Sequence, residues 1–334
     1  MSQSQKNITI ADVAEALGIS KTTVSRAISG KGRIGEGTRQ KVLSYIEEHN
    51  YKPNVIAKGL AQSRTYNLCV VMPGSFSLVD MPFFKDAMTG IQEIAELEEY
   101  DILLCIGQKN NLNSLERVVS NHKVDGVILL RTFLEDTQIE LLQNKGVPFV
   151  TTGSTRYKKV KQVDFDHESA CYELTSILLM RGVKKIALLG GDEQIMANQN
   201  RFLGFKKAME EQGRTVDKEL IFSNLDGRVQ VDRAVDTALS RNVDCILCMD
   251  DAVCTEVVGK LRQDKVPVPQ KVKVASFHNS SVLEDNVPSI TSLDFNSKEL
   301  GMAACKNILA QIEGEEVENK TLLPYEVILK ESTK

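Results

Sequence analysis

ITIADVAEALGISKTTVSRAI, residues 8–28, decides the fold of the first part of the chain. It holds two short helical patterns separated by a break at Gly18 that is too short to be a linker. Thr9 and Asp12 have the spacing of a capping box, and glycine at position 18 suits the left-handed residue just past a helix end. Ser20 is a natural N-cap for the second helix. The stretch therefore predicts two helices that meet at a steep angle, a helix-turn-helix.

Each of the two predicted helices has an apolar and a polar face. Val13 and Leu17 of the first and Val24 of the second are spaced to pack against each other. The outward side chains of the second helix all donate hydrogen bonds: Lys21, Thr22, Ser25 and Arg26. Such groups near a helix N-terminus can read base edges in the DNA major groove. The alternative is an ordinary capped hairpin whose polar face is solvated.

Charge is divided unevenly along the chain. Residues 1–60 carry nine Lys and Arg against five Asp and Glu, a net charge of +4, whereas the whole chain has −4. The remaining 274 residues therefore hold −8. A basic head on an acidic body is typical of a polyanion-binding module joined to a domain with a different task.

A third helix is expected to start near Glu36 and to complete a small three-helix core. Val42, Ile46 and His49 are spaced to supply its inward face. Gly35 stands where a serine would cap this helix better.

Three ordered blocks, IADVAEALGISKTTVSRAISG, TRQKV and NYKPNVIAKGL, resemble the DNA-binding head and hinge of the lactose-repressor (LacI) family. The resemblance implies that the second helix reads base edges. It also implies a hinge helix that enters the minor groove, with Leu60 as a wedge between base pairs. The expected DNA contacts are Thr9, Lys21, Thr22, Ser25 and Arg26 in the head, and Asn54, Ala57 and Leu60 in the hinge.

The hinge sequence agrees with a helix that folds only on DNA. Pro53 can open a helix, and the VIAKGL that follows Asn54 is too short to stay helical alone in water. Gly59 departs from the family, which has a better helix former there, and glycine costs about 1 kcal/mol relative to alanine within a helix. The alternative for Leu60 is a linker side chain that packs on the body.

From about residue 67, short apolar runs alternate with helical stretches. Nearly continuous Val, Ile and Leu runs between helices indicate parallel strands that are covered on both faces. The expected strands are Asn67–Met72, Asp101–Ile106, Val124–Leu130, Pro148–Thr151, Lys185–Leu189, Leu220–Phe222, Val243–Met249 and Val272–Phe277. We expect an α/β fold, in which a three-helix helix-turn-helix head precedes a two-lobed sensor with two parallel, doubly wound sheets.

The strand pattern repeats at an interval of about 118 residues. VDGVILL from Val124 returns as VDCILCM from Val243. Such a repeat predicts two similar lobes that bind a ligand between them and close by a hinge.

The family resemblance implies that this body is similar to a periplasmic binding protein. The chain then crosses between the lobes near Asp164, Leu293 and Thr321. The expected domains are the head and hinge at 1–62, one lobe at 63–163 plus 294–320, and the other at 164–293 plus 321–334.

The resemblance also places effector contacts on loops that follow strands. Asp251 and Arg201 match the family's two principal sugar contacts, and a carboxylate beside a guanidinium suits vicinal hydroxyls. Phe84 matches an aromatic plate for a sugar ring, and Asp166 matches a run that lines the space between the lobes. His278 occupies a ligand position that is Asp in most of the family. The alternatives are structural: a helix-capping aspartate, a surface arginine and a core phenylalanine.

Other features receive no chemical role. Cys245 and Cys248 lie in one predicted strand with side chains on opposite faces, so we expect core packing rather than a metal or redox pair. His167 and His278 are expected to be isolated from any nucleophile. We expect no enzyme activity, no cofactor and no metal. Seven irregularly spaced cysteines, with no signal peptide and no membrane-length apolar run, favour a cytoplasmic protein away from the membrane.

Together these patterns predict a ligand-controlled repressor of transcription. We expect a homodimer on a palindromic double-stranded operator, because one head covers only a half-site. SFHNSSVLEDNVPSITSLDFNSKELG and ALLGG resemble the maltose-repressor branch in Gram-positive bacteria, which favours a sugar effector, maltose or another α-glucoside. The alternatives are a catabolite-control regulator activated by a phosphorylated carrier protein, a nucleobase-responsive repressor, and a sugar receptor or α/β enzyme with an incidental head.

Overall fold

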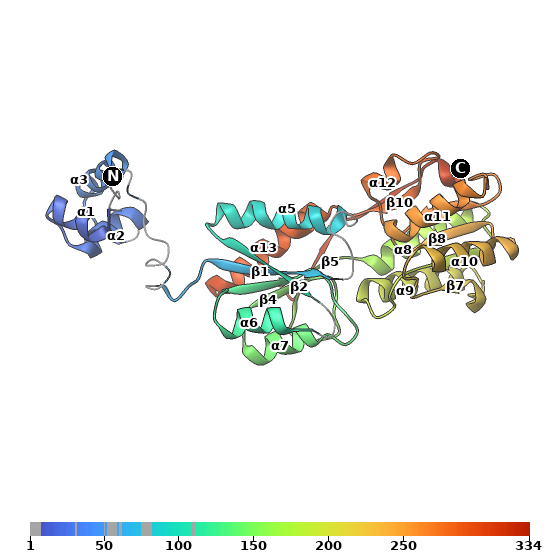
Figure 1. The fold of residues 1–334 in the computed structure, drawn as a ribbon, viewed down its shortest axis with the longest axis horizontal. Coiled ribbons are helices and arrows are strands. Elements are labelled where there is room, and N and C mark those ends of the chain that lie inside the picture. Colours follow the sequence, from blue (N-terminus) through green and yellow to red (C-terminus); the bar gives the residue numbers. More distant parts are fainter. Residues whose placement is uncertain are drawn as a thin grey trace, which may run out of the picture. The chain divides into compact units, whose positions relative to one another are not determined.

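The computed structural model describes residues 8–30, 32–49, 51, 59, 62–74, 82–107 and 111–334. The chain divides into two compact units, a helical head at residues 1–65 and a larger α/β sensor at residues 66–334 (Figure 1). The expected hinge contacts Asn54, Ala57 and Leu60 lie outside the described residues. Within the described part of the chain, no helix is both long and apolar enough to cross a membrane.

The described residues of the head form the helices α1 (Ile10–Leu17), α2 (Lys21–Ser29) and α3 (Glu36–Glu48). The predicted caps of the first two helices are confirmed. Thr9 and Asp12 form the reciprocal capping box of α1, and its C-cap, Gly18, has a left-handed backbone with φ of 65°. Ser20 caps α2 by accepting a hydrogen bond from the backbone N–H of Thr23 at 3.1 Å. Local signals in the sequence therefore set both ends of the turn.

The core of the head includes a tyrosine in place of the expected histidine. Val42 is fully buried, as predicted for α3. His49 is exposed, and its ring stacks on Tyr45 with 3.9 Å between the centroids. Tyr51 joins the core and is 6% exposed. The prediction for His49 was wrong because α3 ends at Glu48, so the helical spacing does not extend to residue 49.

Two six-stranded sheets form the centre of the sensor. The strands are β1 (Asn67–Pro73), β2 (Asp101–Gly107), β3 (Gly126–Leu129), β4 (Phe149–Thr152), β5 (Lys161–Phe165), β6 (Ile186–Leu189), β7 (Ile221–Phe222), β8 (Cys245–Cys248), β9 (Lys273–Ser276), β10 (Thr291–Asp294), β11 (Lys320–Leu323) and β12 (Glu326–Ile328). The first sheet has the order β11-β5-β4-β3-β1-β2 and the second β12-β10-β9-β8-β6-β7. Neighbouring strands are parallel except β10 and β12. The matching orders confirm the predicted pair of similar, parallel-dominated lobes, here called the first and second lobe.

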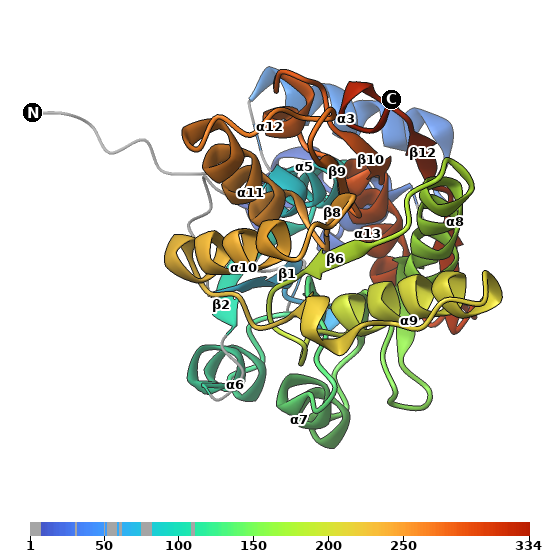
Figure 2. The same ribbon diagram turned by 90° about the vertical axis from the view of Figure 1, so that its right-hand side faces the viewer.

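Helices cover both faces of each sheet. The sensor helices are α5 (Pro82–Leu97), α6 (Asn113–Ser120), α7 (Thr137–Lys145), α8 (His167–Met180), α9 (Met196–Glu211), α10 (Arg228–Ser240), α11 (Asp251–Gln263), α12 (Ser281–Glu284) and α13 (Ser297–Glu313). In the first lobe, α5 and α13 lie on one face of the sheet, and α6 and α7 lie on the other (Figure 1). In the second lobe, α8 and α9 lie opposite α10 and α11 (Figure 2). This cover explains why the central strands are apolar on both sides.

The chain passes between the sheets after β5, after β10 and after β11. These strands and β12 were not among the expected strands. β11 pairs with β5 through Leu323, so the last passage begins after Leu323, near the expected Thr321. In consequence, each sheet is completed by a strand from the far end of the chain.

Two helix pairs approach so closely that only glycine fits between them. A Cβ atom on Gly301 of α13 would lie 2.0 Å from the carbonyl oxygen of Ala87 on α5. A Cβ atom on Gly90 of α5 would lie at the same distance from the carbonyl oxygen of Lys298 on α13. Gly204 makes the equivalent contact between α9 and α8, 2.2 Å from the carbonyl oxygen of Glu168. Each lobe therefore has one helix pair whose close contact requires glycine: α5 with α13 in the first lobe and α8 with α9 in the second.

We expect Gly301→Ala to destabilise the sensor by about 1–3 kcal/mol, because overpacking of a rigid backbone contact forces the helices apart. Gly259→Ala on α11 is the matched control, since a Cβ at Gly259 would meet no atom within 4 Å. That change should be neutral or stabilise by up to about 1 kcal/mol, the helix preference of alanine over glycine. Urea unfolding followed by circular dichroism measures both. A Gly301→Ala protein as stable as the unchanged chain would contradict the close helix contact.

Candidate functional site

The predicted DNA-reading side chains share one exposed face of α2. Lys21, Thr22, Ser25 and Arg26 are all exposed. On the opposite side of the helix, Val24 and Ala27 are fully buried in the head core. Because the buried side fixes the rotation of α2, the exposed side presents its donors in one direction. This arrangement has the form of a recognition helix.

Thr9 belongs to the capping box rather than to the α2 face. Its hydroxyl donates to Asp12 Oδ2 at 2.7 Å, and its backbone N–H donates to the same oxygen at 2.8 Å. The side chain is exposed at the N-terminus of α1. Its observed role is therefore to fix the start of α1.

In the sensor, the predicted effector residue Arg201 of α9 is a buried cation. Its side chain is 9% exposed, which rules out the alternative of a surface arginine. The guanidinium Nη1 donates to the carbonyl oxygen of Met249 at 2.7 Å and, more weakly, to Asn198 Oδ1 at 3.4 Å. Arg201 thus ties α9 to the carboxyl end of β8.

Asp250 and Asp251 follow β8 directly and have different roles. Asp250 caps α11 by accepting the Val253 N–H at 2.8 Å, the structural role that the sequence left open. Burial raises the pKa of Asp250, although Val253 and Arg201 act against this. Asp251 Oδ1 lies 3.1 Å from His278 Nδ1. Burial alone would raise the pKa of Asp251, but the hydrogen bond and charge of His278 lower it.

Arg131 brings a cation from the first lobe to the acids of the second. Burial lowers its pKa to about 10, and the charges of Asp250 and Asp192 act against this. Its guanidinium carbon lies 5.1 Å from the centre of the Phe84 ring. The sequence analysis missed Arg131 and Asp192 as site residues. The sequence feature that could have identified them is a charged side chain shortly after a buried parallel strand, β3 for Arg131 and β6 for Asp192.

The remaining predicted effector residues are placed differently. Phe84 is 8% exposed and packs in the core beneath Arg131. The neighbouring Phe83 has its ring centroid 5.3 Å from that of His278 in the other lobe. Asp166 caps α8, because it accepts hydrogen bonds from the backbone N–H of Ser169 at 3.0 Å and from its hydroxyl at 2.8 Å. Asp251 and His278 therefore contact each other, and Arg201 is hydrogen-bonded to Met249 two residues before Asp251, whereas Phe84 and Asp166 have structural partners.

The two histidines have carboxylate and aromatic neighbours. His278 contacts Asp251 and Phe83 as described, and its ring centroid lies 6.1 Å from that of Phe295. His167 Nε2 lies 3.4 Å from Asp164 Oδ1, and both side chains are buried. The pair of Asp164 and His167 is local in the chain, whereas the contact between Asp251 and His278 joins the ends of two different strands, β8 and β9.

The lobes are also joined by backbone pairing, here called the interlobe bridge. Phe133 of the first lobe pairs with Ile195 of the second in an antiparallel β-bridge. The flanking hydrogen bonds run from the Leu134 N–H to the Gln194 carbonyl at 2.9 Å and from the Met196 N–H to the Thr132 carbonyl at 3.0 Å. The loop after β3 is therefore fastened to the segment before α9.

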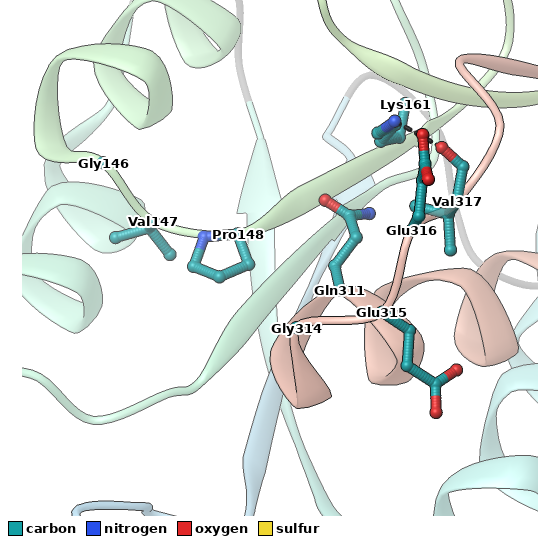
Figure 3. Close-up of a pocket in the computed structure, with 9 residues that line it drawn as sticks. All are labelled: Gly146, Val147, Pro148, Lys161, Gln311, Gly314, Glu315, Glu316 and Val317. Atoms are coloured by element: carbon teal, nitrogen blue, oxygen red, sulfur yellow. Dashed lines mark hydrogen bonds between the residues drawn. The ribbon is translucent and has the colours of Figure 1, made fainter.

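Two surface cavities lie away from these residues. One, of about 360 Å³, is lined by the C-caps of α7 and α13, where Figure 3 shows Lys161 beside Val317. Lys161 Nζ donates to the Val317 carbonyl and to Asn319 Oδ1, so its charge is already engaged. The other, of about 280 Å³, lies beside the end of α11 and is mostly apolar. Neither cavity is lined by a predicted effector residue.

The cysteines behave as packing residues. Cys245 and Cys248 are fully buried in different clusters on the two faces of the second sheet. Their side chains point apart, as predicted for positions within one strand.

Comparisons with known proteins cover both units. Residues 9–54 match the family described as bacterial regulatory proteins, lacI family, and residues 175–333 match a periplasmic binding protein-like domain. The chain is 28% identical to the HTH-type transcriptional regulator MalR of Streptococcus pneumoniae, over 96% of this chain and 97% of that one. It is 27% identical to catabolite control protein A of Staphylococcus xylosus, over 98% and 99%. The solved transcriptional regulator CelR–cellobiose complex is similar with a TM-score of 0.73 and 25% identity, over 97% of this chain and 99% of that chain.

Proposed function

The chain is a LacI-family DNA-binding transcriptional regulator, and we propose that it is a homodimeric repressor controlled by a small carbohydrate held between the lobes of its sensor. The observation that carries the DNA part is the exposed face of α2. The observation that carries the effector part is the contact between Phe83 of the first lobe and His278 of the second, with 5.3 Å between the ring centroids, beside the charge interaction of Arg131 with Asp250.

The head supports sequence-specific binding. Lys21 and Arg26 supply cationic donors, and Thr22 and Ser25 supply neutral ones on the same face. One such helix reads only a half-site, so a palindromic operator requires a two-fold dimer. The hinge residues Asn54, Ala57 and Leu60 are proposed to add minor-groove contacts.

An exposed apolar edge of the first lobe supports self-association. β2 is the end strand of the first sheet, and its Leu104 and Ile106 are 48% and 45% exposed. Exposed apolar side chains on an edge strand are a liability unless another surface covers them. We propose that a second copy of the chain covers Leu104 and Ile106 in the dimer.

The site chemistry supports a neutral, hydroxyl-rich effector. Arg201 supplies donors and Asp251 supplies acceptors, the combination that vicinal hydroxyls need. The similarity to MalR and to a regulator solved with cellobiose favours a disaccharide, with maltose or another α-glucoside as the first candidate. The similarity to catabolite control protein A supports a second candidate, activation by a phosphorylated carrier protein.

Arg26→Ala should weaken specific operator binding by about 1–3 kcal/mol, the contribution of a lost bidentate base contact. Lys41→Ala is the control, because it removes the same charge from an exposed position on α3. Fluorescence anisotropy compares a palindromic operator selected from random duplexes with an unrelated duplex. The control should lower both affinities by a similar, smaller factor. Equal losses in the two variants would remove Arg26 from the base-reading surface.

Asp251→Asn should weaken effector binding about 10- to 100-fold, because a hydrogen bond to a charged group contributes about 1.5–3 kcal/mol. Operator binding without effector should be unchanged. Calorimetric titration with maltose and with cellobiose measures the effect, and Asp226→Asn, at an exposed position of the same lobe, is the control. Normal sugar affinity in the Asp251→Asn protein would move the effector site elsewhere.

A further inference from the structure

Two buried polar side-chain atoms at the strand ends of the sensor have no hydrogen-bond partner among the described residues. They are His167 Nδ1 and Arg201 Nε. The two residues are 6% and 9% exposed, so bulk water does not solvate these atoms. A buried polar atom left unpaired costs free energy, and most buried polar atoms in proteins are therefore bonded to protein, water or a ligand.

The chemistry of the two atoms is complementary. His167 Nε2 faces Asp164 Oδ1 at 3.4 Å, and a carboxylate accepts hydrogen bonds, so Nε2 carries the proton. Burial lowers the pKa of His167, although Asp164 acts against this, so the ring is neutral near pH 7. Nδ1 is then an acceptor, whereas Arg201 Nε is a donor. The two atoms without a hydrogen-bond partner are therefore one acceptor, His167 Nδ1, and one donor, Arg201 Nε.

The position of His167 matches that of the other site residues. It is the first residue of α8 and follows the carboxyl end of β5, as Asp251 follows β8 and His278 follows β9. Arg201 and His278 both act electrostatically on His167, and the rings of His167 and His278 both pack against Phe295. Its ring is held between Phe165 and Phe295, with centroids 6.2 and 4.9 Å away.

We propose that His167 is an effector-recognition residue, whose Nδ1 accepts a hydrogen bond from an effector hydroxyl while the oxygen of that hydroxyl accepts one from Arg201 Nε. This inference rests on the proposed effector site between the lobes. A hydroxyl is the simplest group that both donates and accepts. A carboxylate or a dianionic phosphate has no proton to donate to Nδ1, and an ammonium group cannot accept from Arg201.

The charge balance leads to the same class of ligand. Arg131 and Arg201 face Asp250, and Arg131 also faces Asp192. Each histidine has a separate carboxylate partner: Asp164 for His167 and Asp251 for His278. No excess of positive charge is left among these groups to neutralise a phosphate. The site therefore selects an uncharged sugar over a sugar phosphate.

The test compares the full-length chain with His167→Leu and His167→Asn. Leucine removes the acceptor at similar volume, and asparagine restores a carbonyl acceptor. Calorimetry with maltose, cellobiose and glucose 6-phosphate should give at least tenfold weaker binding of the preferred neutral sugar for His167→Leu and partial recovery for His167→Asn. Glucose 6-phosphate should bind at least tenfold more weakly than that sugar to the unchanged chain.

The pH dependence separates recognition from a purely structural role. A protonated imidazole cannot accept, and burial lowers the pKa of His167, so the sugar affinity of the unchanged chain should fall only as the pH decreases below about 6.5, the ordinary pKa of histidine. His167→Asn should show a shallower fall, because the other groups that act on His167, which are Asp164, Asp166, Arg201 and His278, remain in both proteins. The difference between the two profiles therefore reports His167 itself.

Each outcome decides between the two proposals. Unchanged sugar affinity in His167→Leu, with parallel pH profiles, means that a buried water alone satisfies the two atoms and overturns the role of His167. Tighter binding of glucose 6-phosphate than of either disaccharide overturns the uncharged class. If the unchanged chain binds neither disaccharide while still binding operator, the proposed disaccharide effector fails first and the role of His167 fails with it. Thermal unfolding checks that both variants fold. If His167→Leu does not fold, the sugar affinity and pH profile of His167→Asn decide the question.

Discussion

The placement of the side chains at the carboxyl end of β8 depends on one buried cation, Arg201. Removing a guanidinium from water is costly, so Arg201 can be buried only where acceptors and opposite charge surround it. The Met249 carbonyl and the nearby carboxylate of Asp250 meet that need. Both lie at the carboxyl end of β8, so compensation of the charge also fixes α9 against the second sheet. Asp251 and His278 are placed by the same strand ends.

Much of the fold follows from local sequence, and the exceptions have a common cause. The caps of α1 and α2 were predictable because each involves residues within one turn. The central strands were predictable because burial on both faces makes them apolar. β5, β10, β11 and β12 have no such run. β11 becomes a strand by pairing with β5, and β12 by pairing with β10, partners that lie far away in the chain or beyond a crossing.

The site was predictable only in part for a related reason. Motif resemblance identified Arg201, Asp251 and His278, which the structure brings near one another. It could not identify Arg131 or His167, because their roles depend on how one lobe meets the other. Asp166 was predicted as an effector contact because it is a carboxylate that follows a strand. In the structure, Asp166 accepts hydrogen bonds from Ser169 in the first turn of α8.

The interlobe bridge has a consequence for the timing of a response. Its two backbone hydrogen bonds join the lobes beside the loop that carries Arg131. For the proposed effector between the lobes, separation of the lobes opens the path to the site, and separation breaks the two hydrogen bonds of the bridge. Opening then limits the rates of association and dissociation together, while the equilibrium affinity depends on the contacts made after closure. The bridge therefore adds to the barrier for exchange without adding to the contacts that determine which molecule is bound.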